Sequence, residues 1–123
     1  MQKIIDWHLP IKTVSEANST EHWTKKHKRH KTQKKIIWTV FHAGPDIDIS
    51  LPCHVKITRV SPRFLDTGDN LPCSLKYIKD EIAALLTDNH IPGRGDDDKR
   101  ITWEFDQEKG KPQSIKIEIS IPP

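Results

Sequence analysis

Four segments of the chain alternate apolar and polar residues, and this alternation limits the fold more than any other feature. The clearest of them has isoleucine at positions 115, 117, 119 and 121, interleaved with Lys116, Glu118 and Ser120. The other three cover residues 5–9, 51–57 and 101–105. A period of two is typical of strands with one buried and one solvated face. We therefore predict four strands in one sheet. The last two are separated by "DQEKGKPQ", whose composition favours a hairpin turn.

Two further segments have the period of a helix. In the first, five apolar residues recur every three or four positions: Leu71, Leu75, Ile78, Ile82 and Leu85. Such spacing marks one helical face, and Asn70 is a suitable N-cap, so we predict a helix over 71–86. The second is expected from about Glu16 to His42, with only its last turns well buried. Its apolar anchors would be Trp23, Ile36, Ile37, Val40 and Phe41.

These elements predict a single α+β domain over residues 1–123, with two helices on one face of a small mixed or antiparallel four-stranded sheet. Cys53 and Cys73 fall in different elements, and free thiols fit a reducing compartment. No segment is apolar enough for a signal sequence or a membrane span. The sequence therefore indicates a soluble, intracellular protein with no membrane partner.

One segment, "TKKHKRHKTQKK" at residues 24–35, concentrates positive charge. It contains two histidines, no acid and seven lysines or arginines: Lys25, Lys26, Lys28, Arg29, Lys31, Lys34 and Lys35. A solvated helix face is one interpretation, but such faces normally mix signs, because like charges one turn apart repel. A phosphate backbone would remove this repulsion, which favours nucleic-acid contact. A metal site at His22, His27 and His30 is weaker, because ammonium groups surround them.

Acidic residues gather in two places, at Asp66 and Asp69 before the helix 71–86 and at Asp96–Asp98 before the strand 101–105. Lys76 and Asp80 follow on what we expect to be the exposed side of that helix. Helix capping explains Asp69 and Asn70, and a solvated acidic loop is the simpler alternative for the rest. If the sheet brings the two clusters together, their oxygens would suit Mg²⁺. A basic surface beside such a cluster is the arrangement needed to cleave a phosphodiester.

The segments "LDTGDNLPCSLKYIKDEIAALL" and "GRGDDDKRITWEFDQEKGKPQSIKIEI" resemble the RusA-like family of Holliday junction resolvases, in the form common on phages and prophages. The family pattern corresponds here to Asp69-Asn70-Leu71, Lys76, Asp80 and the Asp96–Asp98 cluster. Looser similarity at Leu9-Pro10 and Ser15–Trp23 extends the resemblance over nearly the whole chain. It departs at the first family aspartate, where Thr67 stands. Asp66 lies one residue earlier, and we expect Gly68 to let the backbone bend so that Asp66 takes that role.

The resemblance implies a homodimer that nicks branched DNA with Mg²⁺ in recombination or repair, in the cytoplasm of a host cell. The implied metal ligands and catalytic acids are Asp66, Asp69 and Asp96 or Asp98, while Lys76 would steady the scissile phosphate. Two symmetric cuts need two active sites, which a twofold dimer supplies. An exposed Ile115–Ile121 face or Trp38 would provide the dimer contact. A catalytically inactive DNA-binding relative and a protein-interaction module remain as alternatives.

Overall fold

The computed structural model describes residues 1–14, 22–43, 49, 51–68, 70–87 and 98–123. It confirms the predicted α+β class and the order strand, helix, strand, helix, strand, strand. The elements are β1 (Gln2–Leu9), α1 (Trp23–Ala43), β2 (Cys53–Ser61), α2 (Asn70–Thr87), β3 (Ile101–Lys109) and β4 (Ser114–Ile121).

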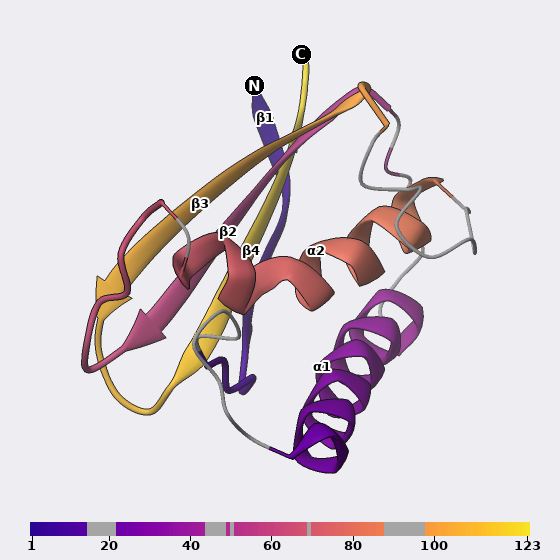
Figure 1. Ribbon diagram of the computed structural model, residues 1–123. Helices are drawn as coiled ribbons and strands as arrows, with labels where there is room; N and C mark the ends of the chain where they lie inside the picture. Colours follow the sequence, from indigo (N-terminus) through magenta and orange to yellow (C-terminus); the bar gives the residue numbers. More distant parts are fainter. Residues whose placement is uncertain (15–21, 44–48, 50, 69, 88–97) are drawn as a thin grey trace.

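The four strands form one mixed sheet in the order β1-β4-β2-β3. β4 is antiparallel to both β1 and β2, while β2 and β3 are parallel. Because β1 and β2 therefore run in the same direction, α1 and α2 each connect two parallel strands. Two such crossovers of the same hand, made in the same direction across the sheet, place their helices on the same face. Figure 1 shows both helices on one side of the sheet.

The expected hairpin between the last two strands is wrong. β2 lies between β3 and β4, so the connection from β3 to β4 must pass over the end of β2. Gly110 lies in this connection where it passes the end of β2, and its N–H donates to the carbonyl of Ser61 at 3.2 Å. A Cβ at position 110 would lie 2.8 Å from Cγ1 of Val60. The missing side chain of Gly110 therefore allows the connection to pass close to β2, and the glycine does not form a hairpin turn.

The core lies between the sheet and the two helices. Ile115, Ile117 and Ile119 of β4 have no exposed surface, and neither has Ile37 of α1. The predicted face of α2 is buried as well, through Leu71, Leu75, Ile78 and Ile82. The alternating isoleucines thus lie inside the fold, and the expectation that they form an exposed dimer contact is wrong for these three. Trp38, the other expected contact, is 52% exposed.

α1 is described from Trp23, and the expected helical start at 16–21 lies outside the described residues. Trp23 is 70% exposed, so it does not anchor the helix. Gln33, which the apolar pattern did not include, is buried, and its Nε2 donates to the carbonyl of Lys12 at 2.9 Å. This bond ties α1 to the segment that follows β1.

Cys53 is buried and Cys73 is half-buried, and both are free thiols as predicted. Burial raises the pKa of the Cys53 thiol, and the nearby Asp98 carboxylate raises it further. Neither α1 nor α2, the helices of the described part of the chain, is long and apolar enough to cross a bilayer.

Leu75→Ala should destabilise the fold by about 2–5 kcal/mol, because Leu75 has no exposed surface and the substitution leaves a cavity. Urea denaturation followed by circular dichroism would measure the loss. Lys111→Ala, at an exposed position, should stay within about 0.5 kcal/mol of wild type. A loss below about 1 kcal/mol for Leu75→Ala would contradict the placement of α2 against the sheet.

Candidate functional site

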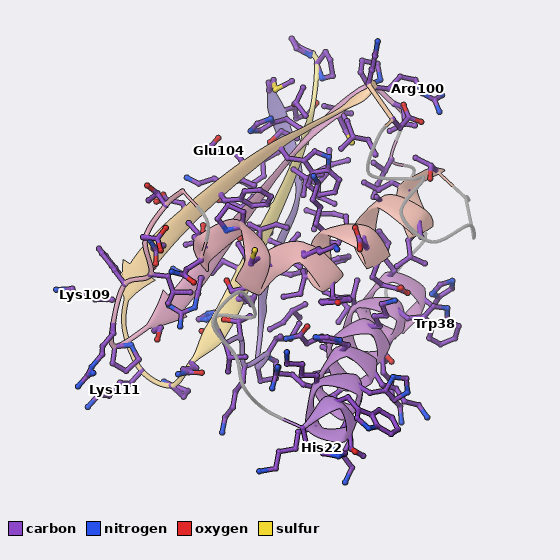
Figure 2. The ribbon with its side chains drawn as sticks, viewed as in Figure 1. His22, Trp38, Arg100, Glu104, Lys109 and Lys111 are labelled. Atoms are coloured by element: carbon purple, nitrogen blue, oxygen red, sulfur yellow. The ribbon has the colours of Figure 1, made fainter. Side chains whose placement is uncertain are left out.

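The seven basic residues of the 24–35 segment all lie on α1, and none of them is buried. Within the described part of the chain, five of them form no ion pair: Lys25, Lys28, Lys31, Lys34 and Lys35. α1 itself carries no acidic residue. Figure 2 shows the side chains that project from α1 between His22 and Trp38. The helix therefore presents positive charge that its own chain leaves largely uncompensated.

The sheet face that the helices do not cover has the opposite character. Its lysines are paired across strands: Lys3 with Glu118 at 2.6 Å, and Lys116 with Glu108 at 2.8 Å. Lys56 lies 3.7 Å from Glu104 and 3.6 Å from Asp106. Because these lysines are paired and five lysines of α1 form no ion pair within the described residues, the helix side is the candidate interface for a polyanion.

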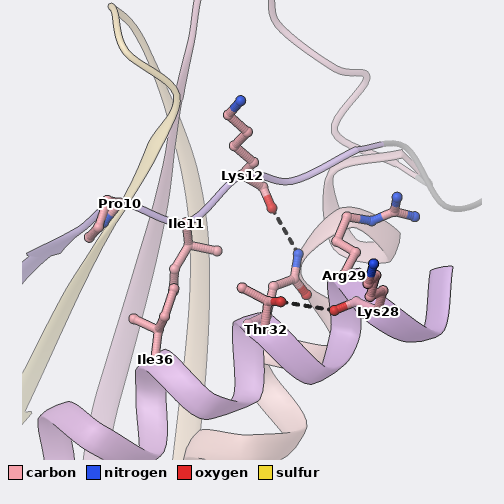
Figure 3. Close-up of a pocket in the computed structure, with 8 residues that line it drawn as sticks. Pro10, Ile11, Lys12, Lys28, Arg29, Thr32 and Ile36 are labelled. Atoms are coloured by element: carbon pink, nitrogen blue, oxygen red, sulfur yellow. Dashed lines mark hydrogen bonds between the residues drawn. The ribbon is translucent and has the colours of Figure 1, made fainter. Parts of the chain in front are cut away.

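A groove of about 350 Å³ runs along one flank of α1, against the segment that follows β1. Its apolar part includes Ile11 and Ile36, and its cations are Lys12, Lys28 and Arg29. Figure 3 shows the Lys12 and Arg29 side chains extending away from the helix. The Thr32 hydroxyl donates within α1, to the carbonyl of Lys28, at 2.9 Å. The long cations are therefore the groups of this groove that face outward to a ligand.

The start of α2 is fixed by the segment that carries Asp66. The side-chain amide of Gln107 both donates to and accepts from the backbone of Leu65, at 2.8 Å each. The Asp66 carboxylate accepts the backbone N–H of Asn70 at 3.4 Å, and the Asn70 side-chain amide also donates to it. Asp66 thus has a capping role at this helix end, which the sequence interpretation did not foresee.

Arg59 is a buried residue that holds the segment leading to Asp66, and the sequence interpretation missed it. It is 6% exposed; its Nε donates to Thr13 Oγ1 and its Nη1 to the carbonyl of Arg63, both at 2.9 Å. Burial lowers the pKa of its guanidinium, which still stays charged. The signal was available, because position 59 continues the inward-facing alternation of 53, 55 and 57.

Gly68 does not provide the bend that we expected of it. Its φ lies outside the left-handed region, and a Cβ there would lie 3.7 Å from Asp66 Oδ1, an ordinary contact. Any residue adopts such a backbone. The position of Asp66 therefore comes from the contacts of Leu65 and Asn70 and not from glycine geometry.

Asp98 lies at the entry to β3, where Arg100 engages both of its oxygens. Oδ1 accepts the backbone N–H and Nε of Arg100, each at 3.0 Å, and Oδ2 accepts Nη2 at 2.7 Å. These bonds hold the pKa of Asp98 at about 2, well below its ordinary value. The carboxylate is therefore ionised across the physiological range.

Arg100→Gln should return the pKa of Asp98 towards its ordinary value of 3.8, because the side-chain bonds of Arg100 are the largest cause of its depression. A carbon-13 NMR titration of the carboxyl group would measure the change. Lys99→Gln removes the same charge one residue away and should leave the pKa low. With a depressed pKa, the pair stabilises the fold above the unfolded-state value of about 3.9. That contribution is lost as the pH falls towards 2. An unchanged pKa in Arg100→Gln would contradict the pairing.

Asp66 and Asp98 do not converge within one chain. The carbonyl of Asp98 accepts the N–H of Ile101 at the start of β3. Leu65, next to Asp66, is bonded to Gln107, six residues further along the same strand. At about 3.3 Å per residue, this places the two acids about 20 Å apart. In Figure 2, Arg100 and Lys109 mark these opposite ends of β3.

Ligands of one Mg²⁺ each lie about 2 Å from the ion, so Asp66 and Asp98 of one chain do not fit a single cation. Within residues 1–14, 22–43, 49, 51–68, 70–87 and 98–123, no group of three or more His, Cys, Asp or Glu side chains is placed to hold a metal. Asp69, Asp96 and Asp97 lie outside these residues, as does most of the Ser15–Trp23 motif.

Lys76 is exposed on α2, as expected, with its Nζ 5.8 Å from the centroid of the Tyr77 ring. Asp80, one turn further along α2, is half-buried, and its Oδ1 atom is buried. Tyr77 also stacks on His30 of α1, with ring centroids 3.5 Å apart and an interplanar angle of 19°. This contact joins the helix of Lys76 to the basic helix, and periodicity alone could not have revealed it.

Comparisons of the chain with family models, with curated proteins and with solved structures found no match.

Proposed function

We propose that this protein is a Mg²⁺-dependent, structure-selective endodeoxyribonuclease that resolves four-way DNA junctions as a homodimer. The observation that carries the proposal is a set of five α1 lysines that form no ion pair within the described part of the chain, beside a helix that bears an exposed Lys76. The resemblance of the segments around Asp69, Lys76 and Asp98 to RusA-like resolvases supports the choice of reaction.

In this proposal the basic residues of α1 hold the DNA backbone, and Lys76 steadies the phosphate at which charge develops. Asp66 and Asp69 would hold Mg²⁺ at the start of α2. The ion, when bound, would polarise the phosphate and activate water. Asp96 or Asp98 is the third proposed acid, although Asp98 does not reach Asp66 within one chain. Two copies related by twofold symmetry would supply the paired cuts.

A second candidate is a DNA-binding relative that has lost its chemistry. Two of the proposed metal ligands lie in the described part of the chain, and both already form hydrogen bonds within it. Asp66 is bonded to Asn70 and Asp98 to Arg100, which favours this candidate. Their separation along β3 favours it as well. This candidate keeps the interface on α1 and needs no metal.

A nicking assay on a labelled four-way junction, with Mg²⁺ and with a chelator, tests the proposal. Paired cuts that disappear in the chelator are expected. Tight binding without cuts, in Mg²⁺ or Mn²⁺, would exclude the nuclease and favour the second candidate. If the junction is not bound at all, the result would favour the protein-interaction module.

A further inference from the structure

The contact between α1 and α2 forms a second pocket, on the flank of α1 that faces α2. Its volume is about 400 Å³, within the range of small-molecule sites. Four α1 side chains and one α2 side chain line it: His27, His30, Lys31, Lys34 and Tyr77. Among the described residues, no carboxylate lines this pocket.

The lining groups share one chemistry, since all four α1 side chains present nitrogen donors. Lys31 and Lys34 each offer three N–H donors and a positive charge, and neither forms an ion pair within the described ranges. The imidazoles of His27 and His30 also donate, and both nitrogens of a ring do so when it is protonated. An oxyanion that accepts several hydrogen bonds is the ligand that such a set recognises.

The pocket is built from regular structure, which fixes the spacing of its donors. The stacked rings of His30 and Tyr77 couple the two helices at the pocket wall. α1 is held on its other flank by the partly buried bond from Gln33 to the carbonyl of Lys12. Four donor side chains therefore start from fixed backbone positions on two successive turns of the helix, which lowers the cost of ordering them around a ligand.

Lys76, at the proposed site of cleavage, lies near one wall of this pocket. Its Nζ lies near the ring of Tyr77, which is also a wall of the pocket. Tyr77 is therefore the residue that connects the pocket to Lys76, which does not itself line it. A polymer with regularly spaced phosphates can occupy both positions at once, whereas a single free phosphate fills only one.

We propose that the pocket between α1 and α2, lined by His27, His30, Lys31, Lys34 and Tyr77, is a backbone-phosphate subsite that guides a DNA strand past Lys76. The inference deepens the proposed function and rests on it for the identity of the strand. Its action is on binding alone and requires no bond to be broken.

The test is an NMR titration of the histidine rings with hexathymidylate in a metal-free, chelator-containing buffer. The ring signals of His27 and His30 should shift saturably. His8 and His54 serve as internal controls, because they lie on the sheet and contact Ser114 Oγ at 2.7 Å and Glu104 Oε1 at 3.0 Å. Their signals should stay in place, and they also report that each variant is folded.

Lys34→Gln should weaken hexathymidylate binding about ten-fold, the effect of losing a charged hydrogen bond. Lys111→Gln removes the same charge from the β3–β4 connection and should bind as wild type does. Equal affinities for these two variants would overturn the proposal. So would shifts that are absent, or that appear equally at His8 and His54.

Two competing ligands complete the experiment. Inorganic phosphate at the same total phosphate concentration should shift the same two rings more weakly, and equal affinity would overturn the assignment to a strand. Hexaglutamate that binds more tightly than hexathymidylate would overturn it in favour of an acidic protein partner. Because no cleavage is measured, saturable shifts without nicking leave the subsite standing. Nicking of a junction without such shifts would remove the subsite alone.

Discussion

Asp69→Asn is expected to abolish Mg²⁺-dependent nicking of a four-way junction while the junction stays bound. The substitution keeps the shape of the side chain but removes its charge, and a carboxylate is the ligand that Mg²⁺ needs. Even outer partners of a metal ligand change activity by 10–100-fold, so a loss of about a hundred-fold or more is expected. Cutting rates on a labelled junction and binding in a chelator would be measured side by side.

The matched control for this experiment is Asp106→Asn. Asp106 is an exposed carboxylate on the open sheet face, 3.6 Å from Lys56, and should be dispensable for cutting. Lys76→Gln should also slow nicking, by about a hundred-fold, if its charge stabilises the transition state. Wild-type cutting by Asp69→Asn would show that the metal ligands lie elsewhere. Weaker junction binding by this variant would instead show that Asp69 supports the interface.

The local part of this fold could be predicted, because each strand and helix follows from a pattern within its own segment. The alternation of Ile115, Ile117 and Ile119 placed all three in the core. Pairing between segments could not be predicted in the same way. The turn composition around Gly110 suits a hairpin, but the glycine is needed where the chain passes Val60 at the end of β2.

The candidate site shows a related limit. The sequence showed acids on either side of the predicted helix. Whether they converge depends on where the chain enters β3 after that helix. An α-helix rises about 1.5 Å per residue, so the 18 residues of α2 separate its ends by about 27 Å. The parallel pairing of β2 and β3 then places Asp98 at the far end of β3 from Asp66. The parallel pairing, which the sequence pattern did not reveal, is therefore what keeps the two acids apart within one chain.

Contacts between helices were beyond the sequence for a different reason. Tyr77 interrupts no pattern on α2, and His30 reads as one more member of a basic run. Only the crossing of α1 and α2 brings their rings to a centroid separation of 3.5 Å. The basic run itself was placed correctly, because an exposed helix face follows from charge alone.

Junction affinity should fall on the order of a thousand-fold between 50 and 200 mM salt, if about six cations of α1 contact phosphates. Each phosphate contact releases condensed counterions into the bulk solution. The free energy gained from this release falls as the bulk salt concentration rises. Fluorescence anisotropy at several salt concentrations would give the slope of log affinity against log salt. A slope near zero would exclude α1 as a polyanion interface.

The double variant Lys25→Gln with Lys28→Gln should reduce this slope by about two, because each lysine releases roughly one counterion. Both side chains are exposed, and neither forms an ion pair within the described part of the chain. The matched control is Lys3→Gln with Lys116→Gln on the open sheet face. These lysines are already paired with Glu118 and Glu108, so the slope should stay at its wild-type value. Equal slopes for the two double variants would mean that net charge, and not the position of α1, governs binding.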